Sequence, residues 1–280
     1  MPRFVISIIM LLLLTPPALA QNSYRIEEVD KGVYAAIAEP GGAATSNAFI
    51  VDLGTQLVVC GAHFSRRAIN DLIAATTAIS PKPIRAFVLA HHHPGYTFID
   101  FDFPANKDLA MSVETRMIMR QESRTLENLL VFFKDGMTFE GTERTLILTS
   151  IGSAHSGGDL IAYVPQSKVL FTSDLSYFDS VGFLGAGSLY GWAAALEGLS
   201  TLQPEKVIPG FGSVGGMAEL NAFKRYLKDF LTEVLAHIEK GDSLETTLAT
   251  FSLPKHEHLP GFKSFTPGNV ERAYLQLKKN

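Results

Sequence analysis

The sequence predicts an α/β fold in which sheets and helices form a sandwich within one domain. Short β-rich runs alternate with segments of helical periodicity, and this succession of strands followed by helices occurs twice along the chain. No linker rich in Ser, Gly or Pro separates the two halves. Of the 280 residues, 46% are apolar and 19% are charged, which is the composition of a globular chain rather than a disordered one. We therefore expect a single domain over residues 21–280.

The elements of the first half follow from short periodic patterns. Runs rich in β-branched and aromatic residues, separated by turns, predict consecutive strands of a largely antiparallel sheet. Apolar residues at helical spacing predict a helix, and a short, continuously apolar run is typical of a strand buried on both faces. The expected elements are strands at residues 32–37, 47–51 and 56–60, a helix at 66–77, a strand at 84–90 and a polar helix at 112–128.

The second half repeats the succession of strands and helices. Four β-rich runs precede a helix, a two-residue β run and a Gly-rich turn, after which a long amphipathic pattern predicts a long helix. The expected elements are strands at residues 137–139, 144–149, 160–164 and 169–172, a helix at 191–201, a strand at 207–208, a turn at 210–216, a helix at about 218–240, and short helices at 244–251 and 270–278.

Residues 1–20 have the pattern of a secretory signal peptide. Arg3 supplies a positive charge, residues 4–14 are largely apolar, and residues 18–20 (ALA) place small side chains where a signal peptidase reads. The apolar stretch is too short to span a hydrocarbon core of about 30 Å, and no cysteine follows it for lipid attachment. We expect a periplasmic or secreted chain that begins at Gln21 and has no stable membrane insertion after cleavage.

Charge and cysteine content exclude two classes of site. The formal net charge is −4 and no stretch is rich in Lys or Arg, so the chain lacks the basic face that a nucleic-acid partner requires. The one cysteine, Cys60, can form neither an internal disulfide nor a cysteine-built metal site. At the end of an apolar strand, Cys60 is expected to be a small buried side chain. We expect a small-molecule substrate or ligand as the partner.

Three contiguous histidines, His91, His92 and His93, follow the continuously apolar strand. In extended geometry His91 and His93 point to one side of the chain and His92 to the other. Two imidazoles on one side can bind a transition metal. His155, in a loop between two strands, and Asp174, after another apolar strand, are further candidate ligands. Asp174 can equally cap the turn after its strand, so both interpretations stay open.

Four ordered motifs make the chain resemble the metallo-β-lactamase-fold hydrolase superfamily. The resemblance extends over about residues 26–236 and implies an αββα sandwich. It also implies that His91, His93 and His155 hold a first metal and that Asp174 is a bridging ligand. The opening at residues 24–34 is similar to that of exported members linked to quinoprotein and sulfur-oxidation systems. The four motifs are residues 90–96 (AHHHPGY), 155–160 (HSGGDL), 171–174 (FTSD) and 207–212 (VIPGFG).

The chain departs from the family pattern at the second metal. Gly95 and Tyr96 stand where the first motif has Asp and His, and Phe211 stands where the last motif has His. The resemblance therefore implies one complete three-His site and a degenerate second site. We expect one zinc ion, although iron or manganese also suits three His and one Asp.

A zinc ion held by three imidazoles keeps one coordination position open for an activated water, the arrangement of catalytic zinc sites. Asp174 would either orient that water or close the site as a fourth ligand. Tyr96 is a candidate donor to an oxyanion but not a general base near neutral pH. The candidate catalytic residues are therefore Asp174 and Tyr96, and the candidate metal ligands are His91, His93, His155 and Asp174.

Other notable residues are expected in structural roles. Phe211 is expected in the core or in a pocket lining. Residues 176–190, with three Gly and several aromatic side chains, are expected to form a pocket wall or lid. His92 is expected to pack or hydrogen-bond on the side away from the metal. The histidines expected at the polar surface are His63, His237, His256 and His258.

Three functions are consistent with these residues. The first is an exported, mononuclear, metal-dependent hydrolase of a small ester, thioester or amide, which the three-His set favours. The second is a catalytically degenerate accessory protein that binds a metal or ligand, which the lost ligands favour. The third is a structural protein in which the three contiguous histidines bind nothing. A shared fold does not decide between them.

Overall fold

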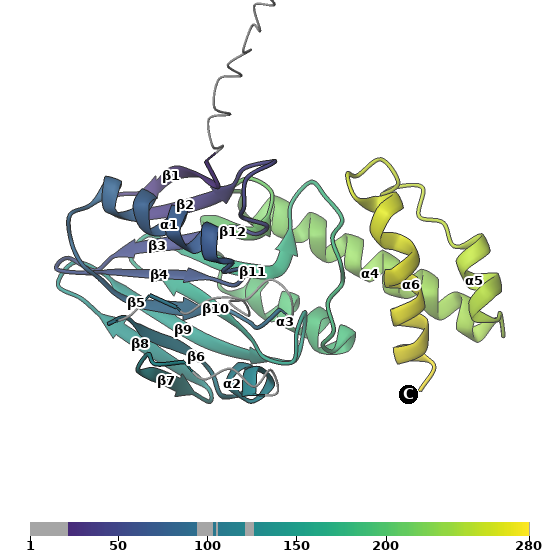
Figure 1. Cartoon of the computed structure of the whole chain (residues 1–280). Helices are drawn as coiled ribbons and strands as arrows, with labels where there is room; N and C mark the ends of the chain where they lie inside the picture. The colour runs from purple at the N-terminus through teal and green to yellow at the C-terminus, as the bar shows by residue number, and fades with distance from the viewer. Residues whose placement is uncertain (1–21, 94–102, 105, 121–125, 280) are drawn as a thin grey trace, which may run out of the picture.

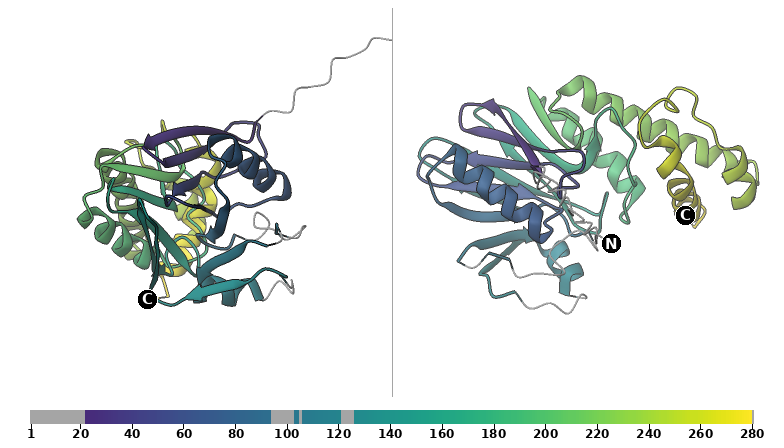
Figure 2. Two further views of the ribbon diagram at one scale, coloured as in Figure 1. Left: turned by 90° about the vertical axis from the view of Figure 1, so that its left-hand side faces the viewer. Right: turned by 45° about the horizontal axis from the view of Figure 1, so that its top comes forward.

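The computed structural model describes residues 22–93, 103–104, 106–120 and 126–279. The predicted signal peptide, Gly95 and Tyr96 lie outside these described residues. In the described part of the chain, two sheets pack face to face and helices cover the outer face of each (Figures 1 and 2). The predicted α/β class and the αββα arrangement are therefore confirmed.

The first sheet contains seven strands whose order in the sheet is their order in the chain. The first four strands pair antiparallel, as predicted for the three of them expected from the sequence, β2 to β4, and the last four pair parallel. The strands are β1 (Tyr24–Asp30), β2 (Val33–Ala38), β3 (Ala48–Asp52), β4 (Leu57–Gly61), β5 (Ile84–Leu89), β6 (Asp108–Ser112) and β7 (Leu130–Phe133).

The second sheet contains five strands in the order β12-β11-β10-β9-β8. Its strands pair antiparallel except for β11 and β12, which are parallel. A strand that returns parallel to its neighbour needs a crossover, and the third helix of the chain provides it. The strands are β8 (Gly136–Glu140), β9 (Thr145–Gly152), β10 (Asp159–Val164), β11 (Val169–Tyr177) and β12 (Lys206–Phe211).

Six helices are present in the described part of the chain, and two differ in length from the predicted ones. Ser112 caps α2 through its side chain, but residues 126–129 are not helical and lead into β7, so the helix predicted at 112–128 is too long. The last helix continues through Pro267, because packing of its buried face outweighs the missing backbone N–H. The helices are α1 (Arg66–Ile79), α2 (Val113–Met119), α3 (Leu189–Thr201), α4 (Met217–Glu239), α5 (Leu244–Thr250) and α6 (Phe262–Leu277).

Successive side chains of the central strands point to opposite faces of the first sheet and so contribute to two different hydrophobic cores. In β4, Val58 and Cys60 face the second sheet, whereas Leu57 and Val59 face α1. In β5, Val88 likewise points between the sheets. Both strands are thus buried on both faces, as the continuous apolar run predicts.

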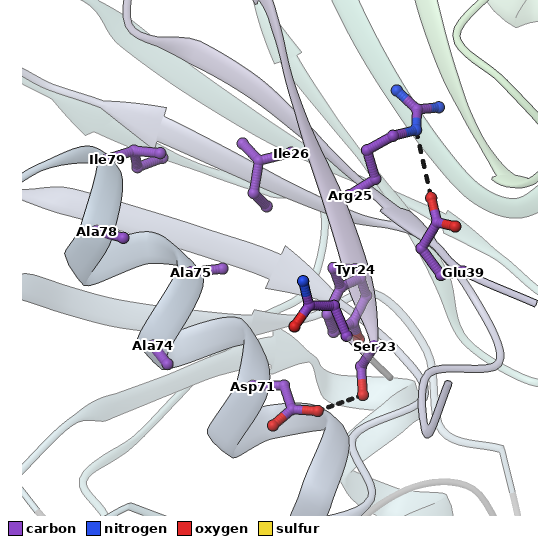
Figure 3. Close-up of a pocket in the computed structure, with 11 residues that line it drawn as sticks. Ser23, Tyr24, Arg25, Ile26, Glu39, Asp71, Ala74, Ala75, Ala78 and Ile79 are labelled. Atoms are coloured by element: carbon purple, nitrogen blue, oxygen red, sulfur yellow. Dashed lines mark hydrogen bonds and ion pairs between the residues drawn. The ribbon is translucent and has the colours of Figure 1, made fainter. Parts of the chain in front are cut away.

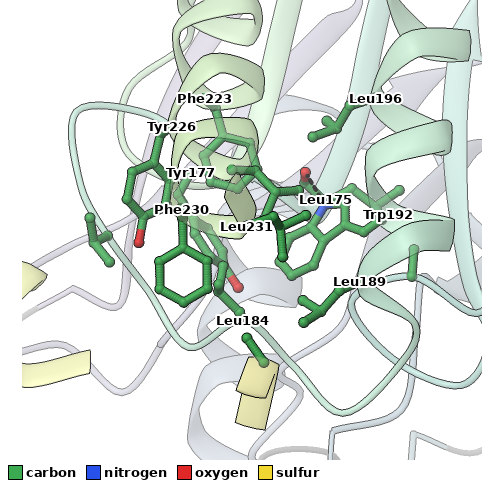
Figure 4. Packing of buried hydrophobic residues seen from close by; sticks show 14 of the residues in the cluster. Leu175, Tyr177, Leu184, Leu189, Trp192, Leu196, Phe223, Tyr226, Phe230 and Leu231 are labelled. Atoms are coloured by element: carbon green, nitrogen blue, oxygen red, sulfur yellow. Dashed lines mark hydrogen bonds between the residues drawn. The ribbon is translucent and has the colours of Figure 1, made fainter. Parts of the chain in front are cut away.

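A third core joins α3, α4 and α6 to the outer face of the second sheet (Figure 4). Trp192 of α3 is buried, donates its indole N–H to the carbonyl oxygen of Leu175 at 2.9 Å, and packs against Phe223 of α4. Tyr177, at the end of β11, packs on both rings. This cluster anchors the end of β11, where the candidate site lies. No helix in the described ranges has both the length and the apolar character needed to cross a bilayer.

Candidate metal centre

Two parallel strands deliver histidines to one edge of the first sheet. Gly61 of β4 pairs with Leu89 of β5, and His63 and His91 each follow two positions later. Because the carboxyl ends of parallel strands lie at the same edge, both imidazoles reach the same place. Their ring centroids are 5.8 Å apart.

Asp174 reaches this edge from the second sheet. The register of β11 shifts at Ser173, whose φ of 48° lies in the left-handed region that non-glycine residues rarely adopt. Gly210 of β12 lies so close to Asp174 that a Cβ atom there would collide with the carboxylate. The Asp174 side chain is 2% exposed and faces imidazoles rather than backbone N–H groups. Among the described residues, no backbone N–H group donates to this carboxylate, as a turn cap would require.

Three imidazole nitrogens surround one carboxylate oxygen of Asp174. From its Oδ2 atom the distances are 3.2 Å to His63 Nε2, 3.7 Å to His155 Nε2 and 3.8 Å to His91 Nε2. The His93 ring centroid lies 5.1 Å from that of His63 and 6.0 Å from that of His155. The structure thus brings the four predicted metal ligands together and adds His63, which the sequence interpretation placed at the surface.

The tightest set of ligand atoms among the described residues is not the predicted one. Single donor atoms of His63, His91 and Asp174 lie within 4.8 Å of one another. His63 is buried, and its Nδ1 atom lies 2.8 Å from Thr45 Oγ1. The sequence signal that could have identified His63 is its place two positions after the end of β4.

Hydrogen bonds fix which nitrogen of His155 faces Asp174. The Tyr177 hydroxyl donates its hydrogen to the carbonyl oxygen of Phe183 at 2.8 Å, because that oxygen can only accept. It must therefore accept from His155 Nδ1–H, which lies 3.1 Å away. Burial raises the pKa of Tyr177 well above its usual value, so the phenol keeps this hydrogen. The Nε2 atom of His155 consequently presents a lone pair to the Asp174 carboxylate.

The loop that carries His155 is held from both sides. The backbone carbonyl of His155 accepts hydrogen bonds from the N–H groups of Ala186 (2.8 Å) and Gly187 (3.0 Å). Asp159, at the start of β10, accepts from the backbone N–H groups of Ala154 (3.1 Å) and Ser156 (2.8 Å) and from the Ser156 hydroxyl (2.8 Å). The imidazole is therefore preorganised before any ligand binds.

Asn47 joins the two sheets beside the site. Its backbone N–H donates to the carbonyl oxygen of Gly210 at 2.8 Å, and its side-chain amide donates to the carbonyl oxygens of Pro209 (3.0 Å) and Gly212 (2.8 Å). Its amide oxygen accepts from the N–H of Ala38 at 2.9 Å. Asn47 thereby fixes the turn after β12 that adjoins Asp174. No local sequence pattern indicates this role.

Burial decides the protonation of the site. Burial lowers the pKa of His155 to about 4 and that of His91 well below its usual value, so both imidazoles are neutral near pH 7. Burial also raises the pKa of Asp174, but the electrostatic interactions with His63, His91 and His155 and a hydrogen bond with His63 outweigh it and hold this pKa below the usual range. An ionised carboxylate therefore lies beside the neutral imidazoles of His91 and His155.

This arrangement fits a metal ion. The lone pair of His155 Nε2 and the Asp174 carboxylate are both electron-pair donors, yet they face each other at 3.7 Å. His91 Nε2 and Asp174 Oδ1 are buried and make no hydrogen bond within the described residues. Buried electron-pair donors that face one another in this way are energetically unfavourable unless a cation or a proton lies between them. Imidazole nitrogen and carboxylate oxygen are the donors that zinc, iron and manganese accept.

A cavity of about 560 Å³ opens beside the histidines. Its polar end is formed by His63, His93, His155 and Asp174. Of the wall predicted at residues 176–190, residues between 177 and 183 line the cavity, and the segment before and within the first turn of α6 completes it. The remaining lining residues are Thr45, Tyr177, Ser180, Val181, Gly182, Phe183, Phe211, Pro260, Gly261 and Phe265.

A second cavity, of about 800 Å³, lies between β1 and α1 and shares no residue with the first (Figure 3). Four of its polar side chains are paired: the Ser23 hydroxyl donates to the Asp71 carboxylate, and Arg25 Nε lies 3.3 Å from Glu39 Oε1. Alanines of α1 and Ile26 form most of its apolar surface. This groove presents no convergent set of metal ligands.

The other histidines have structural roles. His237 is buried, against expectation, and its Nδ1 atom lies 2.7 Å from Asp242 Oδ2. His256 is partly buried beside Asp229, and His258 is exposed as predicted. Phe211 is partly buried and lines the cavity, as predicted. Tyr96, the candidate oxyanion donor, lies outside the described residues, so its role stays a prediction.

The chain is similar to known proteins in sequence and in fold. The family model described as the metallo-beta-lactamase superfamily matches residues 41–210, more than half of the chain. A metallo-beta-lactamase from Pontibacter korlensis superposes with a TM-score of 0.63 at 18% identity, over 73% of this chain and 99% of that one. The DIM-1 metallo-beta-lactamase gives 0.63 at 18% identity, over 74% and 98%. The TMB-1 structure gives 0.59 at 18% identity, over 74% and 98%. With the predicted fold, a matching family model and a buried cluster of metal-ligating side chains at the sheet edge, the chain belongs to the metallo-beta-lactamase superfamily.

Proposed function

We propose that this protein is an exported, metal-dependent hydrolase that binds one zinc ion and acts on a small ester, thioester or amide. The observation that carries the proposal is the convergence of buried, unprotonated donor atoms on the Asp174 carboxylate. In this proposal His91, His93, His155 and Asp174 hold the metal, and His63 supports Asp174 through the contact of its Nε2 atom with Asp174 Oδ2 at 3.2 Å. A bound zinc ion supplies Lewis acidity and an activated water.

The chain's own residues perform the positioning. Tyr177 holds His155 in one tautomer, with its lone pair directed at the centre. Thr45 orients His63 through its hydroxyl. The ionised Asp174 supplies negative charge and a hydrogen-bond acceptor at the polar end of the cavity. The aromatic side chains of the wall exclude bulk water from that end, which strengthens each of these electrostatic contacts.

Elemental analysis tests the metal. We expect about one zinc ion per chain in protein purified without chelator, and loss of that zinc in His91→Ala and Asp174→Ala. His258→Ala is the matched control, because His258 is exposed and should leave the metal content unchanged. Chelator-sensitive turnover of simple esters or thioesters would then support hydrolysis. A chain that neither contains nor takes up zinc, iron or manganese would overturn the proposal.

A degenerate accessory protein is the second candidate, and Phe211 favours it. The Phe211 ring stacks edge-on to Tyr177 at 5.0 Å and lies 6.1 Å from the His63 ring, so an apolar side chain occupies the position of a family ligand. This alternative predicts stoichiometric metal without turnover of any ester, thioester or amide.

Export is part of the same proposal. The signal-peptide pattern at residues 1–20 supports a periplasmic or secreted protein that meets a small-molecule substrate rather than nucleic acid or membrane. N-terminal sequencing of the protein from the expressing cell should give Gln21 as the first residue. An intact Met1 on protein in the cytoplasm would contradict export.

A further inference from the structure

The cavity beside the candidate metal centre has two chemically different ends. At one end lie the histidines and Asp174. At the other, Val181 and Phe183 of the loop after β11 face Pro260 and Phe265 at the start of α6. Residues 260 and 265 lie beyond the segment that the family model matches, so this apolar end is built partly by the chain's own C-terminal helices.

The polar groups in the wall are already used inside the protein. The Thr45 hydroxyl contacts His63 Nδ1 at 2.8 Å. The Tyr177 hydroxyl donates to the carbonyl oxygen of Phe183, and the Ser180 hydroxyl donates to that of Phe178 at 3.2 Å. What the wall offers to a ligand is therefore mainly apolar surface.

No Lys or Arg lines the cavity among the described residues. The cationic side chain behind it, Arg272 of α6, donates one N–H group to the carbonyl oxygen of Leu184 at 2.9 Å and another to that of Gly187. Its guanidinium therefore holds the loop and is not presented to the cavity. A ligand that carried an anionic group into the apolar end would meet no cation there, and burying an unpaired charge is strongly unfavourable.

The two halves of the wall are held as one surface. The backbone N–H of Val181 donates to the carbonyl oxygen of Pro260 at 2.8 Å. The buried Asn269 of α6 accepts from the N–H of Leu184 at 2.9 Å and donates to the carbonyl oxygen of Gly182 at 2.9 Å. The cavity is thus preformed, which lowers the entropic cost of binding.

We infer that this cavity selects a neutral substrate, an ester, thioester or lactone whose acyl or aryl group is apolar and uncharged, with that group against Phe183 and Phe265 and the reacting carbonyl at the histidine end. The inference rests on the proposed hydrolase for the reaction, but the selection for neutral, apolar ligands follows from the wall alone. A volume of about 560 Å³ is in the range of ordinary small-molecule sites and holds a ring or chain of that kind.

A matched pair of fluorescent probes tests the binding step without hydrolysis. N-phenylnaphthylamine is neutral, and anilinonaphthalene sulfonate carries the same rings with one added anionic group. We expect the neutral probe to bind the purified protein at one site per chain, and about tenfold or more tightly than the sulfonate. Equal or tighter binding of the sulfonate, or no binding of the neutral probe, would overturn the inference.

Variants at the mouth of the cavity locate that binding. Phe183 and Phe265 are 39% and 41% exposed, so Phe183→Ala and Phe265→Ala should leave the fold intact. Each should lower the affinity for the neutral probe by about five- to tenfold, as expected for loss of an aromatic contact. Phe132→Ala, at a 54% exposed position of β7, is the control and should have no effect. Phe265→Arg should narrow the preference for the neutral probe, because it supplies the cation that the wall lacks.

A pair of esters separates this inference from the proposed function. Nitrophenyl esters of straight-chain acids should gain about fourfold in kcat/KM per buried methylene until the cavity is filled. The half-ester of a dicarboxylic acid of the same length should react about tenfold or more slowly than the monocarboxylic ester. Probe binding without turnover would overturn the hydrolase and leave the selectivity standing. Turnover without preference for the neutral ester would support the hydrolase and overturn the inferred selectivity.

Discussion

The groove between β1 and α1 and the cavity at the strand ends are opposite in chemistry, although the groove is the larger of the two. In the groove, all the charged side chains have a partner: Asp71 pairs with Ser23, and Arg25 pairs with Glu39. In the cavity at the strand ends, buried donor atoms of His91, His155 and Asp174 point at one another. Volume therefore does not identify which of the two cavities carries the converging candidate metal ligands.

The two cavities differ in whether the fold provides hydrogen-bond or ion-pair partners for their charged and polar side chains. The charged side chains of the groove gain little from a polar ligand, because their hydrogen bond and ion pair are already made. Buried nitrogen and oxygen lone pairs that point at one another destabilise the free protein, and their arrangement becomes favourable only when a cation lies between them. The strongest experiments therefore change matched residues in the two cavities and compare the results.

The largest difference is expected at the two aspartates. Asp174 lies among the imidazoles, and Asp71 accepts from Ser23 in the groove. With free zinc at about a thousand times its Kd, metal binding should add about 4 kcal/mol to the free energy of unfolding. Denaturant titration with and without chelator should show this difference in the native chain and in Asp71→Ala, and none in Asp174→Ala. A chelator response that survives in Asp174→Ala would remove the aspartate from the metal site.

A second prediction concerns Asp159, the carboxylate that holds the His155 loop. Burial raises the pKa of Asp159 to about 7, against the hydrogen bonds that favour its ionised form. Between about pH 4 and pH 7 the folded state therefore keeps a proton on Asp159 that the unfolded state has lost, so the contribution of Asp159 to stability should fall as pH rises, by at most about 1.4 kcal/mol per pH unit. His91 and His155, whose pKa values burial lowers, contribute in the opposite direction over this range.

Asp159→Asn should remove only the contribution of Asp159, so in metal-free protein its free energy of unfolding should rise relative to that of the native chain as pH rises from about 4 to 7. Urea unfolding at a series of pH values measures this difference. The exposed Asp135 supplies the control, since Asp135→Asn should follow the native chain at each pH. Parallel pH profiles of Asp159→Asn and the native chain would mean that Asp159 does not titrate in this window.

Two buried tyrosines give a smaller and more specific comparison. Tyr177 and Tyr226 are each 2% exposed, but the Tyr177 hydroxyl bridges His155 and Phe183, whereas the Tyr226 hydroxyl makes no hydrogen bond within the described residues. Tyr177→Phe should lower metal affinity by about 10- to 100-fold, the usual effect of losing a group that orients a ligand. Competition with a chromophoric chelator measures this.

Tyr226→Phe should leave metal affinity unchanged and stability unchanged or slightly raised, because it removes a buried hydroxyl that makes no bond within the described part of the chain. If both substitutions lowered metal affinity equally, the effect would come from packing in the cluster around Trp192 rather than from the tautomer of His155.

Much of the site was predictable because local patterns determine it. The continuously apolar strand before the three contiguous histidines was recognisable, and so was the Gly-rich loop around His155. The apolar strand before Asp174 was recognisable too, but it continues to Tyr177, so Asp174 lies within β11 rather than after it. His63 was missed because the strand at residues 56–60 was interpreted only as part of an antiparallel run. Its pairing with β5 is parallel, and that register places His63 beside His91.

Other features had no local signal at all. Asn47 resembles an ordinary polar residue before a strand, yet its hydrogen bonds join two sheets across more than 160 positions of sequence. Pro267 ordinarily argues against a helix, and tertiary packing of α6 overrides it. Contacts of this kind depend on where distant segments meet, which periodicity in a single sequence does not encode.

The smallest expected effect lies in the groove. Arg25 and Glu39 are 51% and 32% exposed, and water screens their ion pair. A double-mutant cycle of Arg25→Ala and Glu39→Ala should therefore give a coupling energy below about 0.5 kcal/mol, and high salt should reduce it further. A coupling of several times this value would mean that the groove holds its charges in a fixed, water-excluding arrangement. The pairing of its polar groups would then indicate a binding surface in its own right, and satisfied hydrogen bonds would no longer distinguish the groove from the metal centre.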